Sequence, residues 1–223
     1  MPPRDSRSKT SLLRGLATAI ALLGWGILLL RVQRLYGGHA GAGSGWTAVL
    51  QRFSEYFTLL TNTLACAILT RAASARRGAP HRGPLADPAL ATSAAASMVL
   101  VAGVYGLLLS GRWNPQGWDR VADVGLHYVM PPLFLGYWWL SLPKGCLGWR
   151  DLPRTWIYPL LYLGWILARG ASTGRYPYPF LDVGRLGASV ALNLVALFLA
   201  FNAVAAVLIW GNRRFGPPLN RTR

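Results

Sequence analysis

The chain has 223 residues, of which 53% are hydrophobic and only 13% are charged. Its mean hydropathy is positive, at +0.32. Soluble domains carry about 25% charged residues, so this composition excludes an ordinary soluble protein and indicates an integral membrane protein. The formal net charge is +16, but the basic residues stand between apolar segments. We therefore expect them to contact membrane lipids through anionic headgroups, and we predict no nucleic-acid partner.

Six apolar segments follow one another along the chain, separated by short loops rich in Gly, Pro and Arg. They cover approximately residues 12–30, 53–70, 90–110, 122–142, 155–168 and 186–210. Because a helix satisfies its own backbone hydrogen bonds in lipid, the pattern predicts an all-α polytopic membrane protein. Residues 1–223 are expected to form one domain, a single bundle of six transmembrane helices with short basic tails at about residues 1–11 and 211–223.

The distribution of Lys and Arg predicts how this bundle is oriented. With six spans, 15 of the 23 basic residues fall on the side of the two termini and 8 fall on the opposite side. Cytoplasmic loops carry an excess of Lys and Arg, so both termini are predicted to be cytoplasmic. The second and fourth segments then both run inward from the outer face.

The fourth segment contains an ionisable group at membrane depth, which is costly in lipid and therefore a candidate for function. His127 lies inside the apolar run, and Asp123 precedes it by four residues, on the same helix face. Pro131 cannot donate to the carbonyl of His127, so the backbone is expected to open beside the imidazole. In the structural alternative, His127 fixes helix packing by a hydrogen bond, and Asp123 is only a favourable residue at a helix start.

The second segment contains a polar cluster at the same expected depth. Thr58 and Asn62 are four residues apart and share a helix face, with Thr61 to one side. Thr58 and His127 each lie roughly 8 Å below the outer boundary, so the two clusters are predicted to form one site. In the alternative, the threonines bond back to their own helix and Asn62 bridges two helices.

An aromatic, proline-rich stretch follows the fifth segment on the same outer side. Its residues Tyr176, Tyr178 and Phe180 alternate with two prolines, so the stretch cannot be regular helix. One interpretation is a lid or a lipid-entry lip, in which these aromatic residues belong to the substrate pocket. The other is a rigid interfacial loop that is anchored by its aromatic side chains.

Three motifs together resemble a known family. They are FTLLTN around Thr58, GLHYVMPPLF around His127 and GASTGRYPYPFLD around Tyr178. The chain from Trp46 to Trp210 resembles the bacterial Pr-six-Pr six-helix membrane proteins, which are similar to the eukaryotic androgen-inducible and ADTRP-type membrane hydrolases. The resemblance implies a protein of the bacterial cytoplasmic membrane and a threonine hydrolase that cleaves fatty acid esters of hydroxy fatty acids. By motif, Thr58 matches the family's threonine and His127 its histidine.

The resulting hypothesis is an intramembrane lipid-ester hydrolase. Thr58 would attack the ester carbonyl, His127 would act as its base, and Asp123 would orient the imidazole. Asn62 or backbone N–H groups are candidates for stabilising the oxyanion. Thr61 is the alternative nucleophile, because the spacing of Thr58 and Asn62 departs from the family pattern. No metal or organic cofactor is expected, and the partners are membrane lipids and the lipid-ester substrate.

Two alternatives from other classes stay open at this point. One is a non-enzymatic lipid-binding or scaffold membrane protein, in which the polar clusters serve helix packing. The other is a small transporter, which is less favoured because the acidic residues Glu55 and Asp123 stand at the outer edge rather than near the midplane. The sequence leaves the acyl chain, the physiological ester and the oligomeric state open.

Overall fold

The computed structural model describes residues 4–37, 45–75, 83–112 and 114–216. Every regular element in these ranges is a helix, which confirms the predicted all-α fold for the described part of the chain. The α-helices are α1 (Arg4–Gly37), α2 (Gly45–Glu55), α3 (Phe57–Ser74), α4 (Pro88–Val104), α5 (Gly117–Val124), α6 (Met130–Ser141), α7 (Leu152–Thr155), α8 (Ile157–Thr173), α9 (Val183–Leu186) and α10 (Val190–Arg214). Two π-helical turns continue this series, since Tyr105–Leu109 extends α4 and Gly125–Val129 joins α5 to α6.

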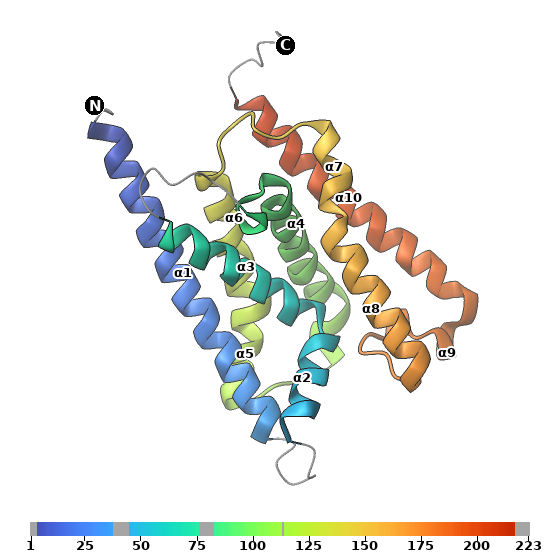
Figure 1. Ribbon diagram of the computed structural model, residues 1–223. Helices are drawn as coiled ribbons and strands as arrows, with labels where there is room; N and C mark the ends of the chain where they lie inside the picture. Colours follow the sequence, from blue (N-terminus) through green and yellow to red (C-terminus); the bar gives the residue numbers. More distant parts are fainter. Residues whose placement is uncertain (1–3, 38–44, 76–82, 113, 217–223) are drawn as a thin grey trace.

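The long helices run alternately in opposite directions through the molecule (Figure 1). α1 begins and α10 ends at one end, which also holds the end of α6 and the start of α7, and which we name the terminal end. The opposite end holds α2, the start of α5 and α9, and we name it the site end. The start of α1 and the end of α10 thus lie at the same end of the molecule, as a topology with both termini on one side of a membrane requires. That this side is cytoplasmic stays a prediction.

Three helices are long and apolar enough to cross a membrane. They span Ser8–Gly37, Pro88–Arg112 and Val183–Arg214, and they match the first, third and sixth predicted segments. The other three segments form helices that are shorter or that carry more polar residues: α8 has 17 residues, and α3 and the π-turn contain the polar clusters. The six-span topology therefore remains a prediction, supported in part by these three helices.

The structure corrects one of the predicted boundaries. The segment 53–70 is not one helix, because Tyr56 takes an extended conformation (φ −96°, ψ 117°) between α2 and α3. Helix also extends into the described parts of the predicted basic tails, since α1 begins at Arg4 and α10 continues to Arg214. Lys and Arg are good helix formers, so a charged flank does not end a helix.

The core lies between α1, α3, α4 and α6. Its largest fully buried side chains include Trp138, Phe134 and Met130, all on α6. At Gly24 the backbone of α1 approaches α3 and α6 so closely that an added Cβ would clash with Cys66 and Met130. A small residue at this position therefore sets the spacing of three helices.

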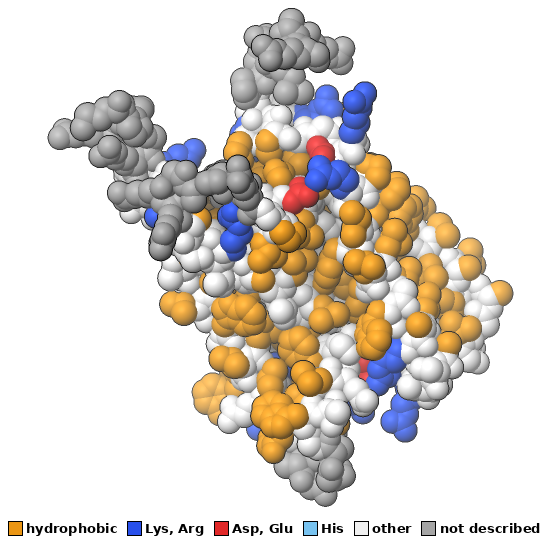
Figure 2. All heavy atoms as spheres, in the orientation of Figure 1, with side chains coloured by type: hydrophobic (Ala, Val, Ile, Leu, Met, Phe, Trp, Pro, Cys, Tyr) orange, Lys and Arg blue, Asp and Glu red, His pale blue; other side chains and the backbone are white. Residues whose placement is uncertain are grey.

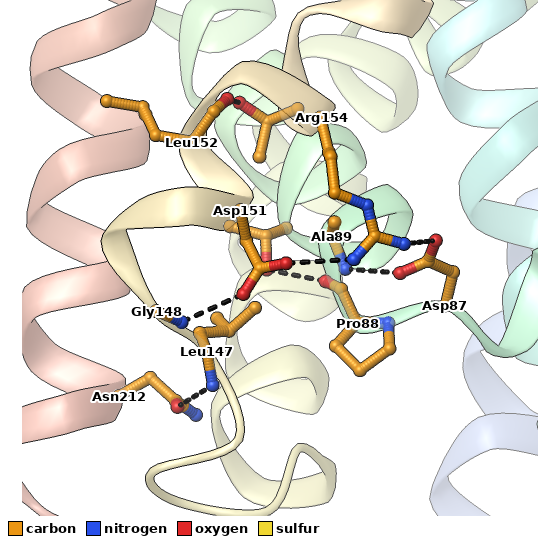
Figure 3. A network of polar contacts seen from close by, with 11 residues as sticks. Asp87, Pro88, Ala89, Leu147, Gly148, Asp151, Leu152, Arg154 and Asn212 are labelled. Carbon is orange, nitrogen blue, oxygen red and sulfur yellow. Dashed lines mark hydrogen bonds and ion pairs between the residues drawn. The ribbon is translucent and has the colours of Figure 1, made fainter.

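A polar network ties helix ends together at the terminal end (Figure 3). Asp87 caps the start of α4 and pairs with Arg154 at 2.7 Å, and Arg154 also pairs with Asp151 at 2.8 Å. Asn212 of α10 accepts a hydrogen bond from the N–H of Leu147 at 3.2 Å. We name Asp87, Asp151, Arg154 and Asn212 the terminal network. It joins α4, α7 and α10.

Apolar side chains cover much of the outer surface. Figure 2 shows hydrophobic atoms over the middle of the visible face, with Lys and Arg side chains towards the two ends. Leu107, Leu161 and Leu192 are exposed by 86%, 70% and 73%. Extended apolar surfaces mark contact with a membrane or another protein, which agrees with the composition of the chain.

Candidate active site

Thr58 lies in the first turn of α3, directly after the break between α2 and α3. The break is held by two tyrosines from other parts of the chain. The hydroxyl of Tyr178 accepts from the N–H of Phe57 at 3.0 Å. The hydroxyl of Tyr162 donates to the carbonyl of Glu55 at 2.7 Å. Because the helix starts here, Thr58 stands at the positive end of the α3 dipole.

His127 lies in the π-helical turn between α5 and α6. Pro131 and Pro132 have no N–H to donate to the carbonyls four residues earlier, so the regular ladder is interrupted beside the imidazole. The N–H of Met130 donates instead to the carbonyl of Gly125, five residues earlier. Such π-turns are rare and are frequent at functional sites.

The structure brings Thr58 and His127 together. Thr58 Oγ1 and His127 Nε2 are 3.3 Å apart, and His127 Nδ1 is 2.9 Å from the carbonyl oxygen of Asp123. A carbonyl oxygen only accepts, so Nδ1 carries the proton and Nε2 presents its lone pair to the Thr58 hydroxyl. This is the tautomer that a general base for Thr58 requires.

Asp123 and Tyr105 hold the imidazole from its other side. Asp123 Oδ1 is 3.3 Å from His127 Nδ1, and the hydroxyl of Tyr105 donates to Asp123 Oδ2 at 2.5 Å. The ring of Tyr105 also stacks on the imidazole, with centroids 3.6 Å apart and an interplanar angle of 15°. Tyr105 begins the π-turn at the end of α4. We name Thr58, His127, Asp123 and Tyr105 the site cluster.

The other two candidate residues of α3 make contacts typical of structural roles. Asn62 is fully buried and donates to the carbonyls of Thr58 at 2.8 Å and Leu126 at 3.3 Å, so it joins α3 to the π-turn. The hydroxyl of Thr61 is 2.8 Å from that of Tyr158. The hydroxyl that contacts His127 is that of Thr58, whereas that of Thr61 contacts Tyr158.

Two of the three aromatic residues of the 176–180 stretch, Tyr178 and Phe180, line a cavity that Thr58 also lines. Tyr178 is buried and stacks on Phe180, with ring centroids 5.2 Å apart. Tyr176 packs instead on Gly170 of α8, where an added Cβ would clash with the ring. Burial raises the pKa of Tyr178 to about 12. A tyrosine hydroxyl is protonated at neutral pH even at its ordinary pKa of about 10, so Tyr178 can donate a hydrogen bond.

Two cavities share part of their lining at the site cluster. The apolar cavity has a volume of about 140 Å³, lies between α4, α8 and α10, and is lined mainly by aliphatic and aromatic side chains. The polar cavity has a volume of about 350 Å³ and is lined by Arg31, Arg112, Asp123 and His127 among others. Thr58 lines both cavities and thus stands at their common boundary.

Three residues that line this site are not predicted as site residues from the sequence. Arg31 and Arg112 follow the first and third apolar segments, where they count only toward the distribution of charge. Tyr105 lies in an apolar segment without a polar pattern, and a π-turn brings it to His127. One signal was available, since a tyrosine inside an apolar run needs a partner for its hydroxyl when buried.

Among the described residues, no three His, Cys, Asp or Glu side chains are grouped so that they could hold a metal ion. The polar groups that face the two cavities include a hydroxyl, an imidazole, a carboxylate and two guanidinium groups. A hydroxyl paired with a correctly protonated imidazole is suited to nucleophilic attack on a carbonyl. No protein-family model, curated protein or solved structure matches this chain.

Proposed function

We propose that the chain is a multi-pass membrane protein that hydrolyses fatty-acyl esters, with Thr58 as the nucleophile and His127 as the base. The proposal depends chiefly on the contact of 3.3 Å between Thr58 Oγ1 and His127 Nε2, where Thr58 lines two cavities. The resemblance to the Pr-six-Pr and ADTRP-type proteins supports the same chemistry. The proposed topology has six spans with both termini cytoplasmic, in a bacterial cytoplasmic membrane.

The reaction has two steps. The Thr58 oxygen attacks the ester carbonyl carbon while its proton passes to His127 Nε2, and the intermediate then breaks the bond to the alcohol oxygen, which takes that proton. This step leaves an acyl-threonine and a free alcohol. Water attacks the acyl carbon and gives a proton to His127 Nε2. The fatty acid leaves as this proton returns to Thr58 Oγ1.

The surroundings of the pair supply charge stabilisation. Asp123 faces the imidazolium that forms in each step, and Tyr105 holds the Asp123 carboxylate in place. The developing oxyanion has two candidate sources of stabilisation, the positive end of the α3 dipole and the hydroxyl of Tyr178, a residue that lines both cavities.

A fluorophosphonate probe, which reacts with activated hydroxyl groups, tests the proposal on the full-length protein in membranes. Wild-type protein should be labelled at Thr58, and both Thr58→Ala and His127→Ala should lose the label. Thr61→Val is the matched control, because Thr61 contacts Tyr158 rather than His127. Full labelling of Thr58→Ala, with loss of label in Thr61→Val, would assign the nucleophile to Thr61 instead.

A non-enzymatic lipid-binding protein is the second candidate, and the apolar cavity favours it. This cavity would hold an acyl chain without any chemistry, because its lining is aliphatic and aromatic. Saturable binding of palmitate, together with no labelling and no ester hydrolysis by wild-type protein, would decide for this candidate.

A further inference from the structure

Two asparagines of α10 bond to residues that line the apolar cavity, and the proposed reaction uses neither of them. Asn193 donates to the carbonyl of Phe180 at 2.9 Å. Asn202 accepts from the indole Nε1 of Trp156 at 3.0 Å and donates to the carbonyl of Phe198 at 2.8 Å. Phe180, Trp156 and Phe198 all line the apolar cavity. Polar side chains in an apolar helix are costly in lipid, so these two need an explanation.

The apolar cavity leads away from the site cluster along the bundle. On α4 its lining extends from Tyr105, which also lines the polar cavity, back to Leu100. On α10 it extends from Leu194 to Phe201. Because α4 runs towards the site end and α10 runs away from it (Figure 1), the lining shared with the polar cavity lies at the site end. Thr58 belongs to this shared lining, and the rest of the cavity leads towards the terminal end.

Aromatic side chains close the far end of this cavity. The indole of Trp156 packs edge to face on Phe198, with ring centroids 5.3 Å apart. Trp156 and Phe201 line the cavity and belong to one apolar cluster with Ala96 and Ala205, which stand further towards the terminal end. Ala96, Phe201 and Ala205 are buried, so packed side chains lie behind this wall. Trp156, which Asn202 holds in place, therefore forms the floor of the cavity.

The dimensions of the cavity limit how much chain it holds. Its lining covers residues from Trp156 to Leu163 on α8 and from Leu194 to Phe201 on α10. At about 1.5 Å per residue, each of these stretches is roughly 10 Å long. An extended chain advances by roughly 1.2 Å per bond, so about nine bonds fit between Thr58 and the floor. The volume of about 140 Å³ is close to that of a cavity that holds benzene, with its six carbons.

The side of the cavity between α8 and α10 is open. Leu160 and Phe198 line the cavity and are exposed by 49% and 41%. A chain too long for the closed part has this side as its exit once it reaches Trp156. Its further carbons then lie among lipid tails, which are as apolar as the cavity, so they add nothing to binding.

The position of His127 decides which half of an ester enters this cavity. His127 lines the polar cavity and does not line the apolar cavity. The leaving alcohol oxygen takes its proton from His127 Nε2, so the alcohol half lies on the polar side and the acyl half enters the apolar cavity. This assignment rests on the proposed function.

We infer that Trp156 limits the length of the acyl chain, and that the acyl subsite fits medium-length chains of about six to ten carbon atoms. Longer acyl groups still bind, but their outer carbons leave through the open side between α8 and α10. Trp156 is then a specificity-determining residue that takes no part in the chemical steps. Asn202 serves the same subsite, because its amide fixes the indole.

Hydrolysis of four p-nitrophenyl esters by full-length protein in neutral detergent tests this inference. The esters are the butyrate, octanoate, laurate and palmitate, and Trp156→Ala removes the floor. Dividing the kcat/KM of the variant by that of wild type cancels the partition of each ester into detergent, which is the same for both proteins. This ratio should stay within about twofold of one for butyrate and octanoate and rise about tenfold for laurate and palmitate. A ratio that is equal for all four esters, or that falls with length, would overturn the inference.

Leu197→Phe makes the opposite change and decides the question if Trp156→Ala fails to fold. Leu197 lines the cavity on α10, about one helical turn before Phe201, so a larger ring there shortens the space. Its kcat/KM relative to wild type should fall about tenfold for octanoate, laurate and palmitate and by less than about twofold for butyrate. An equal loss for all four esters would reject a limit on chain length.

Trp210→Ala is the matched control for the floor variant. Trp210 is an exposed tryptophan of α10 that lines neither cavity. Its kcat/KM relative to wild type should be the same for all four esters. A rise confined to laurate and palmitate in this variant would show that chain length is not read at Trp156.

The inference and the proposed function fail in different ways, because binding of fatty acids needs no chemistry. Suppose that wild-type protein hydrolyses none of the esters, while Trp156→Ala binds palmitate about tenfold more tightly than wild type and octanoate equally. That result retains the acyl subsite and rejects the hydrolase. Hydrolysis with ratios that do not depend on chain length in either variant retains the hydrolase and rejects the subsite.

Discussion

The terminal network and the site cluster lie at opposite ends of the same bundle, and they use their polar groups differently. In the terminal network, Asp87 caps α4 and Asp151 accepts from the N–H of Gly148 at 2.9 Å (Figure 3). Asn212 also donates to the carbonyl of Pro143 at 2.9 Å. These bonds satisfy backbone groups at helix ends, which would otherwise lack partners. The network therefore stabilises the fold.

The site cluster is a chain of contacts that ends at a cavity. Tyr105 donates to Asp123, Asp123 faces His127, and the Nε2 of His127 is directed at the Thr58 hydroxyl. Thr58 lines both cavities, so a ligand can reach the last group of the chain. Burial and hydrogen bonding are common to both clusters, so they do not by themselves distinguish a candidate site. The site cluster differs because its last member faces a cavity.

The largest predicted effect is at His127. Replacing it by glutamine removes the base, so kcat/KM for a palmitoyl ester should fall about 10²- to 10⁴-fold. The thermal midpoint in detergent should change little, because glutamine keeps a hydrogen-bonding side chain of similar reach. Unchanged hydrolysis by a folded His127→Gln protein would mean that the site cluster, like the terminal network, has only a structural role.

Asn212→Ala should have the opposite effect to His127→Gln, lowering stability and leaving hydrolysis unchanged. Asn212 is fully buried, and its loss leaves the N–H of Leu147 and the carbonyl of Pro143 without these partners. The free energy of unfolding should fall by about 1–3 kcal/mol, measured by chemical denaturation in detergent, with hydrolysis per folded molecule unchanged. Asn114→Ala, at an exposed position, is the control and should leave stability unchanged. A loss of activity without a loss of stability would contradict a purely structural role.

Tyr105→Phe should have an intermediate effect within the site cluster. The phenylalanine ring keeps the stack on His127, but the hydrogen bond of 2.5 Å to Asp123 is lost. Loss of such an orienting partner should lower kcat about tenfold and leave KM unchanged. Tyr158→Phe is the matched control, because its hydroxyl contacts Thr61 outside the site cluster. Equal kinetics of the two variants would show that Tyr105 only fills space.

Part of this site follows from the sequence alone. Helix periodicity places Asp123 and His127 on one face, and Pro131 predicts the disturbed backbone beside the imidazole. Equal expected depth predicts that Thr58 and His127 meet. These arguments succeed because they use properties that each helix carries in its own sequence.

The rest depends on contacts between distant segments. The break at Tyr56 has no Pro or Gly beside it, and Tyr162 and Tyr178 hold it by hydrogen bonds across more than 100 residues. Tyr105 and His127 both lie in π-turns, one at the end of α4 and one between α5 and α6, and their rings stack there. At these positions, contacts between distant segments override local helix propensity. Such contacts cannot be deduced from the local pattern of one sequence.

The smallest predicted effect concerns the ion pair between α1 and α5 at the site end. Arg34 donates to Asp119 from Nε at 3.1 Å and from Nη2 at 2.8 Å, and this hydrogen bonding lowers the pKa of Asp119 below its ordinary value. A carboxylate with a lowered pKa stabilises the folded state fully above its unfolded pKa of about 3.9, and this contribution is lost as the pH falls through the folded value.

The thermal midpoints of wild-type and Asp119→Asn proteins should therefore differ by a small constant amount between about pH 5 and pH 8 and should converge below about pH 4. The difference should shrink at high salt, because the pair is partly exposed and screened. A difference that grows above pH 5 would contradict the assignment to Asp119.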